Sequence, residues 1–143
     1  MPSILIIDDD DSLRDGLRRT LHQAGYEVRE ASDGLKGLQI VQEASVDLIL
    51  LDIFMPGKEG LETIGEFRHA HPAIRIIAMS GGGTKGCFDV LTMATMLGAR
   101  RTLAKPFSRE QLLEAVRLEV CYVQTKGLKM NLFWALLLGP SLL

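Results

Sequence analysis

Four short apolar runs, each ending in a polar residue, constrain the fold of this chain more than any other feature. The runs have the length of strands, and the residues that end them are Asp8, Asp52, Ser80 and Lys105. Nearly continuous apolarity is typical of strands that are buried on both faces of a sheet. If the runs are parallel strands of one sheet, their ends meet at the carboxyl edge, where open α/β sheets bind ligands. We therefore expect carboxylates, a hydroxyl and an ammonium to share one crevice.

Segments with helical periodicity alternate with the apolar runs. The predicted strands are 3–8, 26–31, 46–52, 74–79 and 100–104. The apolar stripes of the five predicted helices are Leu13, Leu17 and Leu21; Leu35, Leu38 and Val41; Leu61, Ile64 and Phe67; Val90, Met93, Ala94 and Leu97; and Leu112, Leu113, Val116 and Val120. Alternating strands and helices predict an α/β fold, in which right-handed crossovers place helices on both faces of a parallel sheet.

Residues at the predicted helix ends agree with this division. Asp10 or Asp11 precedes the first helix and is a suitable N-cap, because a carboxylate accepts hydrogen bonds from the free N–H groups of the first turn. Gly25 and Gly98 follow the first and fourth helices, as glycines that end helices commonly do. Ser108 opens a Ser-x-x-Gln capping box for the fifth helix.

Composition narrows the class of protein. A chain of 143 residues is most simply one domain, and a net charge of −2 without a run of five basic residues gives no reason to expect nucleic-acid binding. Two cysteines make neither a metal set nor a disulfide framework, so we expect a reducing, cytoplasmic location. The N-terminus has no basic segment followed by a long apolar one, so a secretory signal is not expected.

The tail differs from the rest of the chain. Residues 126–143 contain no acidic residue, and their longest apolar run, 132–138, is shorter than the roughly 20 residues that span a bilayer, so no membrane association is expected. The tail is either a non-native or disordered end or an extension that packs on a neighbour. An exposed Leu-Phe-Trp segment would favour self-association, so a homodimer is one expected assembly.

The strand-end residues suggest a particular chemistry. Asp8 and Asp9 are adjacent carboxylates that repel each other after a buried strand, and a magnesium ion would relieve this repulsion. Asp52 can attack phosphorus and form an acyl phosphate. The nearby acidic pair raises the pKa of Asp52, and the cation together with Lys105 restores its ionised form. Ser80 would donate its hydroxyl to a phosphoryl oxygen.

At these motifs the chain resembles the receiver domain of two-component response regulators. The motifs are Ile-Ile-Asp-Asp-Asp at 6–10, Leu-Leu-Asp-Ile-Phe-Met-Pro-Gly at 50–57, Ala-Met-Ser-Gly at 78–81 and Lys-Pro-Phe at 105–107. The resemblance covers about residues 3–121 and implies a flavodoxin-like, doubly wound, five-stranded sheet of order 2-1-3-4-5. We accordingly expect a receiver domain at 1–122 and an atypical tail at 123–143.

The resemblance also implies roles for single residues. Asp52 would be the phosphoacceptor and a metal ligand, Asp8 and Asp9 the acidic pair with Asp9 as the direct magnesium ligand, and the backbone carbonyl of Phe54 a further ligand. Ser80 would be the switch hydroxyl. Lys105 would pair with the phosphate.

The resemblance further implies partners. A histidine kinase or histidine phosphotransfer protein would donate the phosphoryl group. The domain would assist its own phosphorylation and dephosphorylation without being an enzyme that acts on other substrates. Its output would be contact with a downstream protein, through the face formed by the fourth helix, the fifth strand and the fifth helix, or phosphoryl relay. A stand-alone receiver and a receiver from a longer chain both fit this description.

Three positions depart from the family pattern. Thr102 stands where an aromatic residue is usual, so a threonine would begin any relay from Ser80. Gly81 follows the switch serine and starts a triple-glycine segment that is expected to be mobile before phosphorylation. Phe54 is bulky, and we hypothesise that its ring obstructs the hydrolytic water and slows dephosphorylation.

Two other functions remain open from the sequence. A magnesium-dependent phosphohydrolase of the haloacid-dehalogenase type uses the same acyl-phosphate chemistry, with its nucleophile in an Asp-x-Asp motif that Asp8 and Asp10 formally match. A pseudo-receiver would be a binding module that is never phosphorylated. The presence of Asp52, Lys105 and the acidic pair argues against it.

Overall fold

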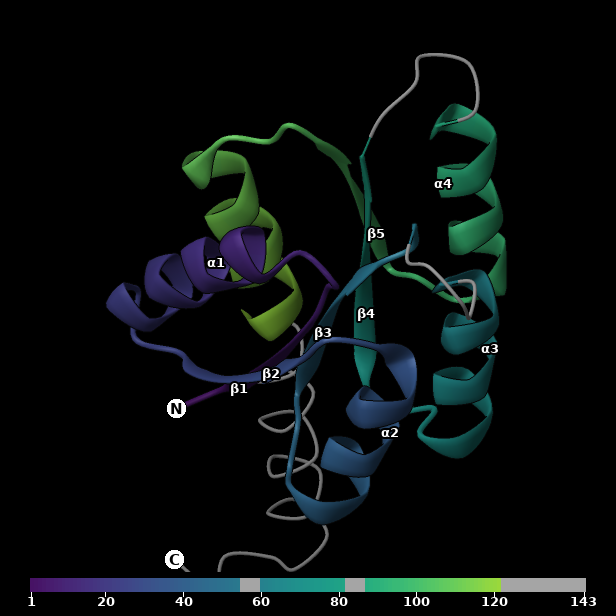
Figure 1. Cartoon of the computed structure of the whole chain (residues 1–143), viewed down its shortest axis with the longest axis horizontal. Coiled ribbons are helices and arrows are strands. Elements are labelled where there is room, and N and C mark those ends of the chain that lie inside the picture. The colour runs from purple at the N-terminus through teal and green to yellow at the C-terminus, as the bar shows by residue number, and fades with distance from the viewer. Residues whose placement is uncertain (55–59, 82–86, 122–143) are drawn as a thin grey trace, which may run out of the picture.

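A computed structural model describes residues 1–54, 60–81 and 87–121 (Figure 1). The tail at 123–143, the turn that continues after Phe54 and the glycine-rich segment 82–86 lie outside the described residues. The predictions made for these three segments, and the boundary at residue 122, therefore stay predictions.

Five parallel strands form one sheet. They are β1 (Ser3–Ile7), β2 (Glu27–Ala31), β3 (Leu48–Asp52), β4 (Arg75–Gly81) and β5 (Arg101–Lys105). Their order is β2-β1-β3-β4-β5, which confirms the expected doubly wound topology. Each strand begins and ends within two residues of its predicted limits. β1 and β3 are buried along their whole length, as their continuous apolar sequences indicate.

Helices cover both faces of the sheet. They are α1 (Asp11–Gln23), α2 (Gly34–Glu43), α3 (Gly60–Ala70), α4 (Cys87–Leu97) and a last described helix over residues 109–121. Figure 1 shows α1 and the last helix on one side of the sheet, and α2, α3 and α4 on the other. Within the described part of the chain, no helix is long and apolar enough to cross a membrane.

Two apolar cores result from this arrangement, because successive residues of a strand point to opposite faces. Leu5 and Ile7 of β1 belong to the core beneath α2, α3 and α4. Ile4 and Ile6 belong to the core beneath α1 and the last helix.

The predicted helix ends are present. Asp10 caps α1, where its carboxylate accepts a hydrogen bond from the backbone N–H of Leu13 at 3.1 Å. Ser108 and Gln111 exchange the two hydrogen bonds of a capping box, at 2.8 and 3.1 Å. Gly25 and Gly98 both have positive φ angles, which favour glycine over residues with a Cβ.

Three residues of the predicted apolar stripes are not in a core. Leu35 of α2 is 63% exposed, and Met93 and Leu97 of α4 are 49% and 43% exposed. The buried residues of α2 are instead Gly34, Gly37 and Val41, whose spacings of three and four keep one face. Leu35 lies off that face. The side chain of Val90 lies outside the described residues.

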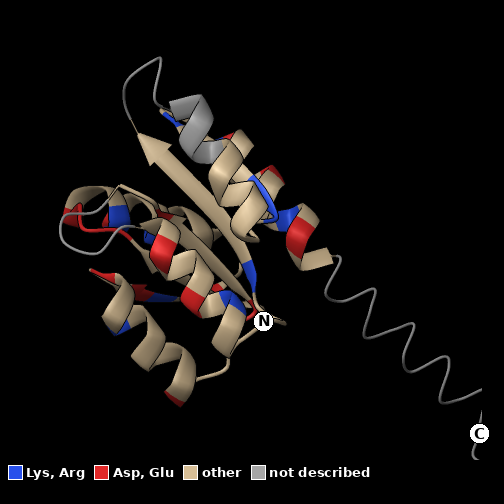
Figure 2. Ribbon diagram, turned by 90° about the vertical axis from the view of Figure 1, so that its right-hand side faces the viewer, with Lys and Arg blue, Asp and Glu red and all other residues tan. Residues whose placement is uncertain are grey.

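Acidic and basic residues are interspersed over the described elements (Figure 2), and one group of them is buried. Glu119 of the last helix is 5% exposed and accepts a hydrogen bond from Arg75, the first residue of β4. Arg101, the first residue of β5, donates to the other oxygen of Glu119 at 2.8 Å. Arg75 is a charged residue inside the otherwise apolar segment 74–79, and its ion pair with Glu119 explains how the charge is accommodated there.

Candidate functional site

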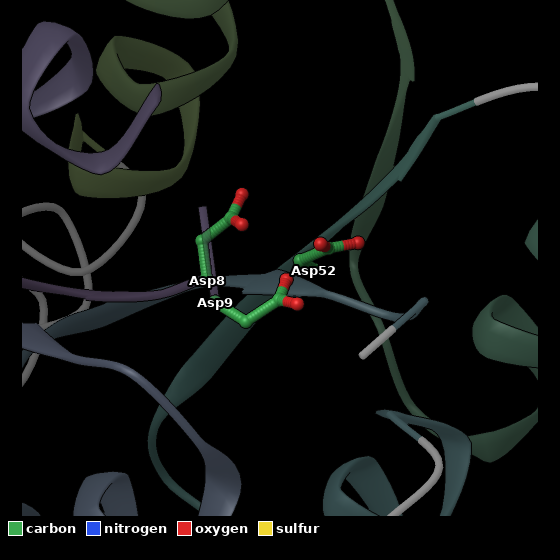
Figure 3. Close-up of side chains that lie close together, drawn as sticks. All are labelled: Asp8, Asp9 and Asp52. Atoms are coloured by element: carbon green, nitrogen blue, oxygen red, sulfur yellow. The ribbon is translucent and has the colours of Figure 1, made fainter. Parts of the chain in front are cut away.

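Three carboxylates meet at the carboxyl edge of the sheet, at the ends of β1 and β3 (Figure 3). These two strands are neighbours, with Ile7 opposite Leu51, so Asp8 and Asp52 come at the same level. Asp8, Asp9 and Asp52 each offer a carboxylate oxygen, and these three oxygens lie within 4.8 Å of one another. The structure thus brings together the acidic residues that the sequence predicted to converge.

Asp8 is fully buried and held at several points. One carboxylate oxygen accepts the backbone N–H of Asp10 at 2.9 Å, and the other accepts Lys105 Nζ at 3.0 Å. Its own backbone N–H donates to the carbonyl of Ala31 at the end of β2, at 3.2 Å. Burying a carboxylate is costly unless it is paired and hydrogen-bonded, and these contacts supply both forms of compensation.

Asp52 is the last residue of β3 and is only 4% exposed. The backbone N–H of Phe54 donates to its Oδ1 at 3.0 Å, and Lys105 Nζ lies 3.5 Å from its Oδ2. Burial raises the pKa of the Asp52 carboxyl to about 6, and the charge of Asp8 adds to the rise. The Phe54 N–H and Lys105 act in the opposite direction. Near pH 7 the carboxyl is therefore mostly ionised.

Lys105 ends β5 and completes the cluster, since its ammonium contacts both buried carboxylates. Gly81 of β4 lies opposite Lys105 in the sheet. A Cβ at Gly81 would lie 3.0 Å from Cδ of Lys105, so the glycine leaves room for the lysine side chain to run toward the carboxylates.

Ser80 and Thr102 lie on neighbouring strands at the same edge. Ser80 is buried and lies one residue beyond Met79, the partner of Asp52 in the sheet. Thr102 of β5 is half-buried and lies opposite Ala78 of β4. Because Ala78 and Ser80 are two residues apart on one strand, Thr102 and Ser80 share one face of the sheet.

The donor set suits a hard divalent cation. Magnesium binds oxygen ligands and needs only one or two carboxylates of the protein, with waters or phosphate oxygens in the remaining positions. Asp9 is exposed beside the two buried carboxylates, and Phe54, with its backbone carbonyl, is 49% exposed at the rim. Three carboxylates so close together leave uncompensated negative charge that one lysine does not balance, which a dication would do.

Comparisons with known proteins agree on one family. The family model described as the response regulator receiver domain matches residues 4–117. The chain is 34% identical over 114 residues to sporulation initiation phosphotransferase F of Bacillus subtilis (strain 168), a match that covers 80% of this chain and 90% of that protein. The chain belongs to the response regulator receiver domain family.

Other relatives extend beyond the receiver domain. The uncharacterized transcriptional regulatory protein YrkP of Bacillus subtilis (strain 168) is 39% identical over 111 residues, which cover 76% of this chain but only 45% of that protein.

Among solved structures, a CheY-like response regulator receiver domain protein from Methanospirillum hungatei JF-1 matches with a TM-score of 0.80 at 26% identity, covering 88% of this chain and 98% of that one.

Membership in the family indicates what a site of this kind does in general. Receiver domains of two-component systems are phosphoacceptors that are phosphorylated on an aspartate, and they are not classical enzymes. They generally bind Mg²⁺ at an acidic pocket, and they interact with histidine kinases or phosphotransferases. In this chain the acidic pocket is formed by Asp8, Asp9 and Asp52.

Sequence reasoning missed one residue beside the site. Arg14 of α1 donates from Nη1 to the backbone carbonyl of Asp8 at 2.7 Å. No spacing rule indicates this contact, because it depends on the angle at which α1 leaves β1. The only available signal was the cap at Asp10, which places a residue one turn further on close to the end of the strand.

Proposed function

We propose that this receiver domain accepts a phosphoryl group on Asp52, with Mg²⁺ as cofactor, from a histidine kinase or histidine phosphotransfer protein. The observation that most strongly supports Asp52 as the phosphoacceptor is the combination of its burial, its ionisation and its contacts. Asp52 is a buried, mostly ionised carboxylate, with one oxygen bound by the Phe54 N–H and the other beside Lys105. Asp8, by contrast, already has both oxygens hydrogen-bonded.

The transfer itself is a nucleophilic displacement. An oxygen of Asp52 attacks the phosphorus of a phosphohistidine, the P–N bond breaks, and its electron pair remains on the imidazole nitrogen while an acyl phosphate forms. Lys105 would follow the new negative charge by pairing with a phosphoryl oxygen. Ser80 would donate its hydroxyl to another.

Asp8, Asp9, Asp52 and the Phe54 carbonyl would hold the Mg²⁺. When bound, the cation would neutralise the charge that gathers between the carboxylates and the phosphoryl oxygens. Asp8 lies deepest and would contribute mainly through its charge, while the exposed Asp9 would bind the cation most directly.

The output would be a changed protein-interaction face on α4, β5 and the last helix, with a downstream protein or a second copy of the chain as partner. Thr102 would link Ser80 to this face through β5. In support, Met93, Met96, Leu97 and Leu118 are exposed apolar residues on the two helices. A groove of about 470 Å³ lies between the elements, and Thr95, Leu103 and Gln111 are among its lining residues.

The decisive experiment measures intact mass after incubation with Mg²⁺ and acetyl phosphate. We expect one phosphoryl adduct on the wild-type chain, and none on Asp52→Asn or when the metal is chelated. Asp47→Asn, which changes a carboxylate that precedes β3 at the opposite edge of the sheet and keeps an oxygen to accept the Ser3 N–H, is the matched control and should be phosphorylated normally. No adduct with any donor would support a pseudo-receiver. Continuous hydrolysis of phosphate esters that depends on Asp8 would support a phosphohydrolase.

A further inference from the structure

Arg14 contacts the site from outside the carboxylate cluster. Besides its hydrogen bond to the Asp8 carbonyl, its Nη2 pairs with Asp11 at 2.6 Å and its Nε lies 3.4 Å from Glu30 of β2. The side chain is only 16% exposed. One guanidinium thus joins α1, β2 and the peptide that follows β1.

The carbonyl that Arg14 holds belongs to the peptide between Asp8 and Asp9. Asp8 has other supports, since its carboxylate is bound by the Asp10 N–H and Lys105. Asp9 differs, because its carboxylate is exposed and, among the described residues, no hydrogen bond or ion pair holds it. The direction of the Asp9 side chain toward Asp52 therefore depends on how its backbone is held.

We propose that Arg14 is a positioning residue for the metal site, which fixes the Asp8–Asp9 peptide so that the Asp9 carboxylate faces the Mg²⁺ position. This inference rests on the proposed function, because it concerns the same site. Groups that hydrogen-bond to metal-binding residues typically change metal affinity by about 10–100-fold when they are removed.

The charge of Arg14 acts in the opposite direction. A cation close to the site repels Mg²⁺, so the loss of the charge alone would strengthen metal binding. Positioning and charge therefore predict opposite signs for the same substitution, and the direction of the change in Mg²⁺ affinity separates them.

Arg18 provides a matched control. It lies one turn further along α1, pairs with Asp15 at 2.5 Å, and its Nε lies 3.6 Å from the same Glu30. Arg18 thus has the same charge as Arg14, an aspartate partner on the same helix and the shared neighbour Glu30, but it makes no hydrogen bond to the Asp8 carbonyl. Arg18→Gln removes an equal charge from the same helix and leaves the peptide held.

The test is a calorimetric titration of the full chain with Mg²⁺ alone. We expect Arg14→Gln to raise the Kd for Mg²⁺ by about tenfold. Arg14→Lys should raise it less, because the ammonium keeps the charge and one donor, and Arg18→Gln should leave it at the wild-type value or slightly lower. The phosphorylation rate of Arg14→Gln with acetyl phosphate should lag behind wild type at low Mg²⁺, and the gap should narrow as Mg²⁺ is raised.

Several outcomes would overturn the inference. Equal Kd values for Arg14→Gln and Arg18→Gln, or tighter binding by Arg14→Gln, would show that Arg14 does not position the site. Circular dichroism checks that both Arg14 variants fold. If Arg14→Gln does not fold and Arg14→Lys does, a Kd for Mg²⁺ in Arg14→Lys equal to that of wild type would also show that Arg14 does not position the site. A wild-type chain that is phosphorylated on Asp52 while the Arg14 variants bind Mg²⁺ normally would leave the proposed function intact, whereas a wild-type chain that binds no Mg²⁺ would overturn both.

Discussion

The buried Asp52 carboxyl loses hydration on folding, and this loss makes its effect on stability depend on pH. Its pKa rises from 3.8 to about 6, so the folded chain binds this proton more tightly than the unfolded chain. The contribution of Asp52 to stability is therefore fully present below about pH 4 and is lost as the pH rises through about 6.

Asp52→Asn removes this titration with little change of shape. Each unit of pKa corresponds to about 1.4 kcal/mol, so the variant should be more stable than wild type by about 1–3 kcal/mol near pH 7.5 without metal. The advantage should shrink toward about pH 4.5, where wild-type Asp52 is largely protonated in the folded chain. Urea unfolding of both proteins with a metal chelator at pH 7.5 and pH 4.5 measures this difference in the free energy of unfolding. An advantage that stays constant between them would show that the burial of Asp52 has been misjudged.

Phe54 is the second residue with an effect of its own. Phe54 is 49% exposed at the rim of the site, and its backbone N–H donates a hydrogen bond to the Asp52 carboxylate. We expect Phe54→Asn to shorten the lifetime of the phosphorylated chain several-fold, because a smaller polar side chain admits and orients water. The decay of the phosphorylated mass after removal of the donor gives this lifetime.

A substitution elsewhere controls for general effects on the surface. Leu35 is exposed on α2, so Leu35→Asn changes an apolar side chain in the same way and should leave the lifetime unchanged. A lifetime for Phe54→Asn equal to that of wild type would remove the water-exclusion hypothesis.

At the scale of elements, α3 begins against the backbone that follows Asp52. A Cβ on Gly60 would overlap Cα of Ile53, a contact that only a backbone shift can relieve. We expect Gly60→Ala to destabilise the chain by about 1–3 kcal/mol. Gly65 of the same helix has nothing within 4 Å of such a Cβ, so Gly65→Ala should instead stabilise it by up to about 1 kcal/mol. Chemical unfolding of both variants checks the pair, and equal effects would contradict the close approach.

The last helix is attached to β4 and β5 through Glu119. Glu119→Gln removes a buried negative charge that contacts both Arg75 and Arg101, so we expect a loss of about 2–3 kcal/mol in the free energy of unfolding. Glu114 on the same helix is exposed, and Glu114→Gln should stay within about 0.5 kcal/mol of wild type. If the two variants unfold alike, the cluster contributes little to the attachment of the helix.

The elements also show which parts of the fold can be predicted from sequence. Strand positions follow from the apolar runs, because strands buried on both faces tolerate little else. For α2 the predicted apolar stripe included Leu35, which the structure exposes. Because a helix has 3.6 residues per turn, residues at successive spacings of three rotate steadily around it, and Leu35 therefore lies away from the core. In α4 the apolar residues Met93, Met96 and Leu97 are exposed while Ala94 is buried, so periodicity alone could not identify the covered face.

At the scale of the whole molecule, the parallel topology does most to assemble the site. Asp8 and Lys105 are 97 residues apart in sequence, yet the sheet order brings their side chains to 3.0 Å. This convergence was predictable from the strand ends alone. The contact of Arg14 with the Asp8 carbonyl and the pairing of Glu119 with Arg75 were not, because each depends on how a helix is set against the sheet.

The measurement that tests the central claim most directly is the location of the phosphoryl group. After reaction with acetyl phosphate and Mg²⁺, borohydride reduction converts an acyl phosphate to an alcohol, and tandem mass spectrometry of the resulting peptides identifies the modified residue. We predict that Asp52 alone is reduced, in an amount equal to the phosphoryl adduct seen by intact mass. Reduction at Asp8 instead, or a phosphate on Ser80 that resists borohydride, would contradict the account.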